Sequence, residues 1–455
     1  MDCEALLIHP LYSKMQDINE NIGIGYIASY SRARGRKIEI LDIAARGWSL
    51  KQAVEYICAG PPPLIGISIL FQEGAAEALA FARMLRKGGV KSHIIVGGIY
   101  PTFEYQNLLH NHPEIDSVCI GEGEETFHHL LESLLKGADI SKVEGLALRK
   151  DGSIVTTPPR APLMDLDSLP FPARDVLPYT LKRKTYAPIV SSRGCYGRCS
   201  FCSVSGFFTS IKARYRARNP ERVADEIESL IEEYGVRRFT FDDANFMGAG
   251  RAGRERAAEF ARIVMERGLK IEYSIQCRCD NVERELFKLM KQSGLVRVYL
   301  GVESGSQPQL DRYCKDAGVE ENLRALQVLA DLGIFVQMGF IMFDPLATVE
   351  DISANQRFLA DVKAMFPADK LGYLSPTTKL IPLSGSEYME RLKEAGQLKG
   401  NYLDYTYDFA DKKTAMLYNI SSKSASMLWG AKKLFKNKSG DEEGFPPHWR
   451  KAQGE

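Results

Sequence analysis

Short apolar runs alternate with amphipathic segments along the first third of the chain. Continuous apolar runs predict strands buried on both faces, and the segments between them, such as Gly23–Arg34 and Ala76–Lys87, have helical spacing. The predicted strands are Ala5–Ile8, Lys37–Leu41, Leu64–Ile69, Ile94–Gly98 and Ser117–Ile120. This alternation predicts an α/β fold in which residues 1–140 form a Rossmann-like, doubly wound parallel sheet.

The pattern changes over residues 141–186. Two short strands from Leu146 to Thr156 flank Asp151-Gly152, which is a strong hairpin-turn sequence. The stretch Pro158–Pro188 is rich in proline and has little periodicity. We therefore expect residues 141–186 to hold a hairpin and a linker between two domains.

The alternation of strands and helices resumes at Ala187. The predicted strands are Ala187–Ser192, Arg238–Asp242, Ile271–Gln276, Arg297–Gly301, Ile334–Phe343 and Leu371–Ser375. These strand–helix units predict a partial (β/α)6 barrel of the TIM type over residues 187–385, with its chemistry at the carboxyl ends of the strands. For residues 386–455 we expect a small, polar, helical C-terminal region that ends in a frayed tail.

Composition and charge narrow the class of protein. Of the 455 residues, 45% are hydrophobic and 26% charged, which is an ordinary composition with enough apolar side chains for large cores. The 59 basic and 58 acidic residues leave a net charge of +1, so no overall field attracts nucleic acid. No apolar run is long enough to span a membrane, the start is too acidic for a signal peptide, and nine cysteines lack paired spacing. We expect a cytoplasmic protein with no nucleic-acid partner.

Three cysteines, Cys195, Cys199 and Cys202, follow the first predicted barrel strand with the spacing C-x3-C-x2-C. Three thiolates on one loop can reach three corners of a [4Fe–4S] cluster, which normally takes four ligands, so one iron stays open. Phe201, one place before the last cysteine, offers a face to a planar ring. The alternative is a partial zinc site, but zinc prefers four ligands in pairs and no second pair follows. The spacing therefore favours an iron–sulfur cluster.

Polar residues follow three other predicted barrel strands. The pair Asp242-Asp243 follows the second strand, the segment Cys277–Asp280 the third, and the pair Glu303-Ser304 the fourth. Each pattern alone is commonly a cap for the next helix. The carboxyl ends of barrel strands meet at one mouth, however, so we expect these residues to share a pocket with the cysteine loop.

Together these motifs resemble the radical S-adenosylmethionine (SAM) superfamily, specifically the enzymes with an N-terminal cobalamin-binding-like domain. The family's C-x3-C-x-aromatic-C motif is matched by Cys195–Cys202, its strand-end aspartate pair by Phe241–Phe246, and its Gly-Val-Glu-Ser-Gly-Ser motif by Gly301–Ser306. The N-terminal domain is matched by segments that contain glycine, namely Gly23–Ala28, Gly66–Ser68, Val96–Thr102 and Gly121–Thr126.

The resemblance implies a [4Fe–4S] cluster on the three cysteines, with SAM on its open iron. It implies that Phe201 contacts the adenine and that Glu303, with Ser304 beside it, binds the ribose. Arg278 would approach the SAM carboxylate or ribose.

The resemblance also implies candidate catalytic and cobalamin-binding residues. Asp242 or Asp243 would lie near the SAM amino group or the substrate, and the cysteines take part in the chemistry through the cluster. Gly66, Gly97 and Gly98 would leave room for a cobalamin, and no histidine stands where a cobalt ligand would. The alternative is an ordinary Rossmann-like sheet without a ligand.

Two features of the barrel leave their roles open. The segment Phe343–Leu346 departs from the Leu-Pro-Gly-Glu-like turn of the relatives, so Asp344 is either specific to the substrate or a turn residue. Cys277 and Cys279 are either small buried hydrophobes or hydrogen donors that reach the pocket.

The leading functional prediction is reductive cleavage of SAM to a 5′-deoxyadenosyl radical, hydrogen abstraction from a small molecule and cobalamin-dependent methyl transfer to an unactivated carbon. The first alternative is a radical dehydratase, lyase or cyclase whose N-terminal domain is empty. A second is a non-catalytic iron–sulfur protein, which the acidic strand ends disfavour. The resemblance implies a secondary-metabolite or lipid precursor as substrate and an electron donor such as flavodoxin or ferredoxin.

Overall fold

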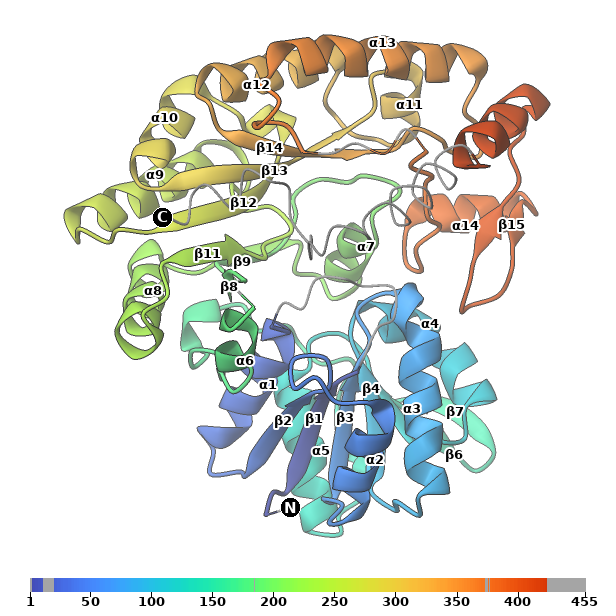
Figure 1. The fold of residues 1–455 in the computed structure, drawn as a ribbon. Helices are drawn as coiled ribbons and strands as arrows, with labels where there is room; N and C mark the ends of the chain where they lie inside the picture. Colours follow the sequence, from blue (N-terminus) through green and yellow to red (C-terminus); the bar gives the residue numbers. More distant parts are fainter. Residues whose placement is uncertain (1, 11–19, 184, 373–374, 376, 424–455) are drawn as a thin grey trace, which may run out of the picture.

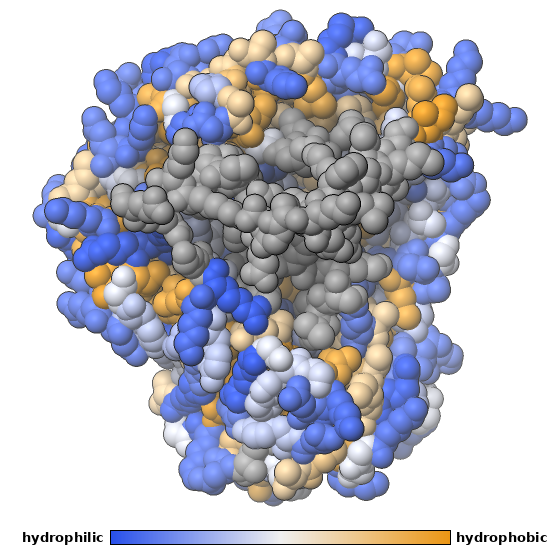
Figure 2. Space-filling view, viewed as in Figure 1, coloured by the Kyte–Doolittle hydropathy of each residue, from blue (hydrophilic) through white to orange (hydrophobic). Residues whose placement is uncertain are grey.

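The computed structural model describes residues 2–10, 20–183, 185–372, 375 and 377–423. Two α/β domains face each other across the middle of the molecule (Figure 1). The N-terminal domain, blue in Figure 1, lies below the curved sheet of the second domain. Hydrophilic side chains cover most of the outer helices and of the N-terminal domain in the view of Figure 2.

The first sheet has the strand order β2-β1-β3-β4-β5-β6-β7. Its first five strands in the chain run parallel and occupy the predicted positions. The bounds are β1 Ala5–His9, β2 Ile38–Asp42, β3 Leu64–Ser68, β4 His93–Gly97, β5 Ser117–Cys119, β6 Leu146–Lys150 and β7 Ser153–Thr156. The predicted hairpin, β6 and β7, joins this sheet by antiparallel pairing of β6 with β5. The hairpin thus extends the N-terminal sheet instead of standing in a linker.

Helices cover both faces of the first sheet, because alternate residues of its parallel strands point to opposite sides. Leu6 and Ile8 pack with α2, α3 and α4, whereas Ala5 and Leu7 pack with α1 and α5. These helices are α1 Ile22–Arg32, α2 Leu50–Cys58, α3 Ala75–Lys87, α4 Ile99–Asn111 and α5 Glu124–Leu135. The side chain of Asn21 caps α1 by accepting a hydrogen bond from the backbone of Ile24.

The second domain is a partial barrel of five parallel strands in the order β14-β13-β12-β11-β8. The strands are β8 Ala187–Ile189, β11 Arg238–Phe241, β12 Glu272–Arg278, β13 Leu295–Glu303 and β14 Phe335–Phe340. A short antiparallel pair, β9 Ser192–Gly194 and β10 Tyr215–Ala217, lies beside β8. The residues that the structure describes contain five strands of the six predicted. The sixth, Leu371–Ser375, falls partly outside those residues, and its Leu371 forms an isolated parallel bridge with Val336.

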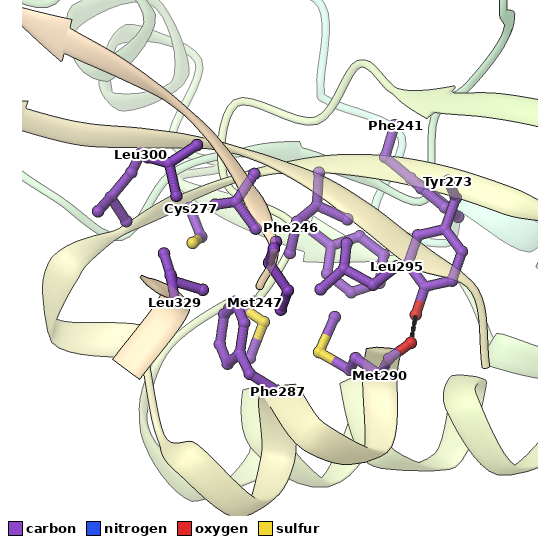
Figure 3. Close-up of a cluster of buried hydrophobic side chains, with 14 of the residues drawn as sticks. Phe241, Phe246, Met247, Tyr273, Cys277, Phe287, Met290, Leu295, Leu300 and Leu329 are labelled. Atoms are coloured by element: carbon purple, nitrogen blue, oxygen red, sulfur yellow. Dashed lines mark hydrogen bonds between the residues drawn. The ribbon is translucent and has the colours of Figure 1, made fainter. Parts of the chain in front are cut away.

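Helices follow the barrel strands and pack on the outer side of the curved sheet (Figure 1). They are α8 Pro220–Tyr234, α9 Gly250–Glu266, α10 Arg284–Gln292, α11 Gln307–Arg312, α12 Val319–Asp331 and α13 Val349–Met365, and α6 Leu177–Leu181 and α7 Ser203–Ser210 lie between the domains' sheets. Figure 3 shows Phe287 and Met290 of α10 pointing toward the sheet. There they meet the fully buried rings of Phe241 and Tyr273 in one continuous core. This core is the barrel's outer layer, so the opposite face of the strands is left for the mouth.

The C-terminal region returns to the N-terminal domain. It contains α14 Glu387–Glu394, the short strands β15 Leu398–Lys399 and β16 Thr406–Tyr407, and helical residues 412–423. Tyr100 on α4 donates a hydrogen bond to the carbonyl of Tyr402 at 2.7 Å, and Ser384 donates to Glu104 at 2.6 Å. The predicted helical region therefore also contains a small hairpin, and it bridges the two domains. No helix in the described residues has both the length and the apolar character that crossing a membrane requires.

Buried ion pairs also join the domains. Arg174, in the segment before β8, binds Glu20 of the N-terminal domain at 2.8 Å and Glu226 of the barrel at 2.7 Å. All three side chains are at least 93% buried, and Arg218 binds Glu226 as well. Arg174 contacts one glutamate from each domain. Because an unpaired buried charge is costly, separating the domains would be unfavourable.

We predict that Arg174→Met destabilises the protein by about 3–5 kcal/mol, because it leaves the buried carboxylate of Glu20 without its cation. The free energy of unfolding measured by chemical denaturation tests this expectation. The matched control is Arg251→Met, which removes an exposed pair with Glu255 and should cost less than about 1 kcal/mol. Equal effects of the two substitutions would contradict the role of the Arg174 contacts.

Candidate functional site

The three cysteines lie on the loop between β9 and α7, at the carboxyl end of the barrel. Gly194, just before Cys195, has a positive φ of 87°, and a Cβ there would lie 2.1 Å from the carbonyl of Arg214. The loop is tied to the barrel because the backbone of Ser200 donates to the carbonyl of Tyr313 at 2.8 Å. The tight turn that the sequence predicted before the cysteines is therefore present and requires glycine.

Several donors point at the cysteine sulfurs. The backbone N–H of Gly197 lies 3.3 Å from the Sγ of Cys195, and the Nη1 of Arg278 lies 3.3 Å from the Sγ of Cys199. The Nδ2 of Asn245 lies 3.8 Å from the Sγ of Cys195. Such donors stabilise thiolates, which are the form that ligates iron.

The thiols would have to lose their protons to a metal, and their spacing fits an iron–sulfur cluster. Burial raises the pKa of the Cys199 thiol and raises that of Cys202 to about 11, so without a metal the protons stay on. Among the described residues, no three histidine, cysteine or acidic side chains gather around a point that a single metal ion could occupy. A cubane instead distributes its protein ligands over separate irons. The donor set of Cys195, Cys199 and Cys202 therefore fits a [4Fe–4S] cluster.

The guanidinium of Arg278 packs against the cysteine loop. Its guanidinium donates to Cys199 and, at 2.9 Å, to Asp280, and it also donates to the backbone carbonyl of Lys315. A Cβ on Gly197 would lie 2.6 Å from the same guanidinium, so the loop passes directly over it. The predicted contact between Arg278 and SAM stays a prediction, because the described contacts of this side chain are all within the protein.

Glu303 and a lysine that the sequence patterns did not single out form a pair near the loop. The β13–β14 register shifts at Glu303, whose φ is 68°, and its carboxylate accepts a hydrogen bond from Lys315 at 3.1 Å. Lys315 is almost fully buried, and the nearby thiol of Cys199 also acts on its charge. The only sequence signal for Lys315 is its place in the short connection between two helices after the Glu303 strand.

Phe201 and Ser304 have contacts of different kinds. Phe201 is partly buried and packs edge-on against Tyr313, with ring centroids 5.4 Å apart. Ser304 is fully buried and donates toward both Gln309 and Asn355, which fixes the turn after β13. The place of Ser304 beside the SAM ribose and the adenine contact of Phe201 both stay predictions.

The two adjacent aspartates point in different directions. Asp243 is fully buried and accepts hydrogen bonds from the backbone N–H groups of Ser191 and Ser192 at 2.7 and 3.1 Å. It holds the segment that leads into the cysteine loop and does not reach the cavity. Asp242 lines the cavity between the domains, and burial by the surrounding protein raises its pKa to about 7. The side chain of Asp242 is exposed, and it is exposed to the cavity that it lines.

The remaining open residues of the barrel are structural. Asp344 is fully buried and accepts hydrogen bonds from Gln309 at 2.7 Å and from Tyr313 and Tyr388 at 3.0 Å. It joins the barrel to α14 and is not a substrate contact. Cys277 and Cys279 are buried in the hydrophobic core, so neither reaches the cavity.

A cavity of about 460 Å³ lies between the two domains. Its floor is the carboxyl edge of the first sheet, at Leu7 of β1 and at Gly66 and Ser68 of β3. These strands flank the point where the strand order reverses, which is where doubly wound sheets bind their ligands. Across from the floor, the cavity is lined by α7, which starts directly after Cys202, and by Asp242.

The glycines predicted to face a cobalamin line this cavity, but packing explains two of them. A Cβ on Gly66 would lie 2.8 Å from the ring of Phe127, and one on Gly98 would lie 2.3 Å from the carbonyl of Ile69. A Cβ on Gly97 would lie 3.3 Å from the Cβ of Cys119, which is a tight but less severe contact. The apolar walls and the position at the strand-order reversal fit a large flat ligand such as a corrinoid; these glycines by themselves do not demonstrate one.

Comparisons with known proteins match both domains. The B12 binding domain family matches residues 8–131, and the Radical SAM superfamily matches residues 189–359. The chain is 27% identical over 362 residues to an uncharacterised methyltransferase of Pyrococcus horikoshii, covering 79% of this chain and 77% of that protein. It is 30% identical over 377 residues to the anaerobic magnesium-protoporphyrin IX monomethyl ester cyclase of Rubrivivax gelatinosus, covering 78% of this chain and 65% of that protein.

A solved structure has the same fold over nearly the whole chain. It is that of the cobalamin-dependent S-adenosylmethionine radical enzyme OxsB with aqua-cobalamin bound, with a TM-score of 0.81 and 22% identity, covering 99% of this chain and 70% of that chain. The fold and the cysteine loop define a radical SAM enzyme. The chain belongs to the radical SAM superfamily and carries an N-terminal B12-binding domain. This confirms the resemblance inferred from the sequence motifs, and it implies a [4Fe–4S] cluster and SAM as cofactors.

We predict that anaerobically reconstituted protein binds about four irons per chain. Replacing Cys195, Cys199 and Cys202 with alanine should remove this iron and all SAM cleavage, because no other described cysteine lies on the loop. Iron content and 5′-deoxyadenosine release measure the two effects. A Cys3→Ala/Cys58→Ala variant is the control and should keep both, whereas undiminished iron in the triple variant would refute the assignment.

We predict that Glu303→Gln weakens SAM binding about tenfold or more while the cluster stays intact. A hydrogen bond to a charged group contributes roughly 1.5–3 kcal/mol, and the substitution removes the charge but keeps the side-chain volume. Equilibrium dialysis of SAM against cluster-loaded protein measures the effect. Glu321→Gln changes a surface pair on α12 and should leave the affinity unchanged. Equal SAM affinity in wild type and Glu303→Gln would exclude the role.

Proposed function

We propose that the protein is a cobalamin-dependent radical SAM methyltransferase that acts on an unactivated carbon of a small molecule. The observation that carries this proposal is that one cavity touches both cofactor regions. The helix that begins after Cys202 and the carboxyl edge of the B12-binding domain line the same cavity. A substrate in that space would lie between the two cofactors.

When bound, the cluster and SAM supply hydrogen-atom abstraction, and cobalamin supplies a transferable methyl group. The chain's own residues position these groups. Arg278 and Gly197 hold the cysteine loop, and the Lys315–Glu303 pair lies beside it as a polar contact for SAM. The apolar cavity walls exclude water, which protects reactive species from side reactions.

The relatives support methyl transfer as the leading function and a radical cyclase or lyase as the second candidate. The match to the uncharacterised methyltransferase of Pyrococcus horikoshii covers most of both proteins, and the two-domain fold shared with OxsB, a cobalamin-dependent S-adenosylmethionine radical enzyme, supports cobalamin dependence. The cyclase of Rubrivivax gelatinosus, of which this chain spans just under two thirds, favours the second candidate, a radical cyclase or lyase. Both candidates take a small-molecule substrate, for which we propose a secondary-metabolite or lipid precursor. We further propose a cytoplasmic location and reduction by a flavodoxin or ferredoxin.

We predict that protein purified anaerobically with hydroxocobalamin retains a corrinoid. On incubation with SAM and a reductant it should release both S-adenosylhomocysteine and 5′-deoxyadenosine, because methyl transfer and hydrogen abstraction each consume SAM. Mass spectrometry with and without the corrinoid measures both products. The triple cysteine variant is the control, since it should keep the corrinoid but lose 5′-deoxyadenosine. If no corrinoid is retained and turnover is unchanged without it, the cyclase or lyase candidate replaces the methyltransferase.

A further inference from the structure

The cavity between the domains contains one acidic side chain that the protein leaves without a partner. Among the described residues that line it, three carry a carboxylate, namely Glu122, Glu124 and Asp242. Arg193 binds both glutamates, and Arg216 binds Glu122 as well. Within the described part of the chain, the Asp242 carboxylate makes neither a hydrogen bond nor an ion pair. Asp242 therefore has free acceptor capacity that faces the cavity.

The position of Asp242 separates it from the SAM-binding residues. The one cation that acts on its carboxylate is Arg174, which already bridges Glu20 and Glu226. Glu303 and the three cysteines of the loop are not among the described residues that line the cavity, whereas Asp242 is. Asp242 thus lies on the side of the barrel mouth that faces the N-terminal domain.

A ligand that fills the cavity would remove water from Asp242. The pKa of Asp242 is raised to about 7, and a cation in the ligand would favour the ionised carboxylate and offset the cost of burying it. Arg193 and Arg216 balance Glu122 and Glu124, which leaves Asp242 as the unpaired acid among the described lining residues. Phe71, Phe207 and Phe208 line the same space, and aromatic faces attract organic cations.

We infer that the substrate carries a positively charged nitrogen, as an ammonium or guanidinium group attached to an apolar body, and that Asp242 binds this group. The inference rests on the proposed function in placing the substrate in this cavity. It adds a class of substrate and a residue that determines specificity. Neutral analogues of the same shape would leave the carboxylate unpaired and would bind more weakly.

Three probes of similar shape test the inference: tryptamine, which is a cation, tryptophol, which is neutral, and indole-3-propionate, which is an anion. Calorimetry on protein loaded with cluster, corrinoid and SAM should show tryptamine binding about tenfold more tightly than tryptophol, as one charged hydrogen bond allows. Indole-3-propionate should bind most weakly. Asp242→Asn keeps the side-chain shape and should abolish the preference, while Asp242→Glu should keep part of it.

The control is Glu255→Gln, an exposed acid on α9 that should leave the preference unchanged. Iron content checks that each variant is folded. Equal binding of tryptamine and tryptophol by the wild type overturns the inference, and failure of tryptamine to bind counts as no preference. A preference that survives in Asp242→Asn also overturns it. Failure to retain corrinoid would instead count against the proposed function, and the probes would then be compared on protein loaded with cluster and SAM alone.

Discussion

The site depends on buried ion pairs between arginine and glutamate at the contact of the two domains. Arg193 is the clearest case, because it lies in β9, two residues before Cys195. Its guanidinium binds Glu122 at 2.9 Å and Glu124 at 2.5 Å, and both glutamates lie at the carboxyl edge of the B12-binding sheet. Both charges are nearly fully buried, so a displaced partner would leave a costly unpaired charge. The cysteine loop is thereby tied to the cofactor edge of the other domain.

This tie places the two edges face to face, so that they line one cavity together. The carboxyl edge of the first sheet and the barrel mouth each end in polar or glycine-containing turns, which alone would be exposed. Held face to face, they enclose apolar walls from Ile24, Ile67 and Phe207. The C-terminal region adds a second bridge through Tyr402 and Ser384, which contact α4. Apolar walls suit radical chemistry, because water at the reacting groups would quench or divert reactive species.

Much of the fold follows from periodicity, whereas the roles of single polar residues do not. The continuous apolar strands of the first sheet were predicted because burial on two faces leaves few polar positions, whereas the barrel strands β11 and β12 alternate buried and less buried residues. The hairpin β6–β7 was predicted as local structure, but its pairing with β5 depends on a sheet edge that no local pattern reveals. The cysteine loop was predicted because ligand spacing within one loop is local. The internal partners of Ser304 and Asp344 and the place of Lys315 beside Glu303 were not predicted, because whether a polar side chain is satisfied internally depends on partners distant in sequence.

The pair Asp242-Asp243 shows which part of a residue's role the sequence can predict and which part it cannot. In β11, Phe239 and Phe241 point into the helix-covered core, so Thr240 and Asp242 point to the opposite face by strand alternation. The sequence therefore contained the information that Asp242 faces the barrel interior. The sequence did not indicate the partners of Asp243, which follows the strand and accepts hydrogen bonds from the backbone of Ser191 and Ser192. That contact uses the carboxylate of Asp243 completely and positions the segment before the cysteines. The carboxylate of Asp243 accepts the hydrogen bonds of the nearby backbone donors and holds the loop. The carboxylate of Asp242 is therefore left to face the cavity.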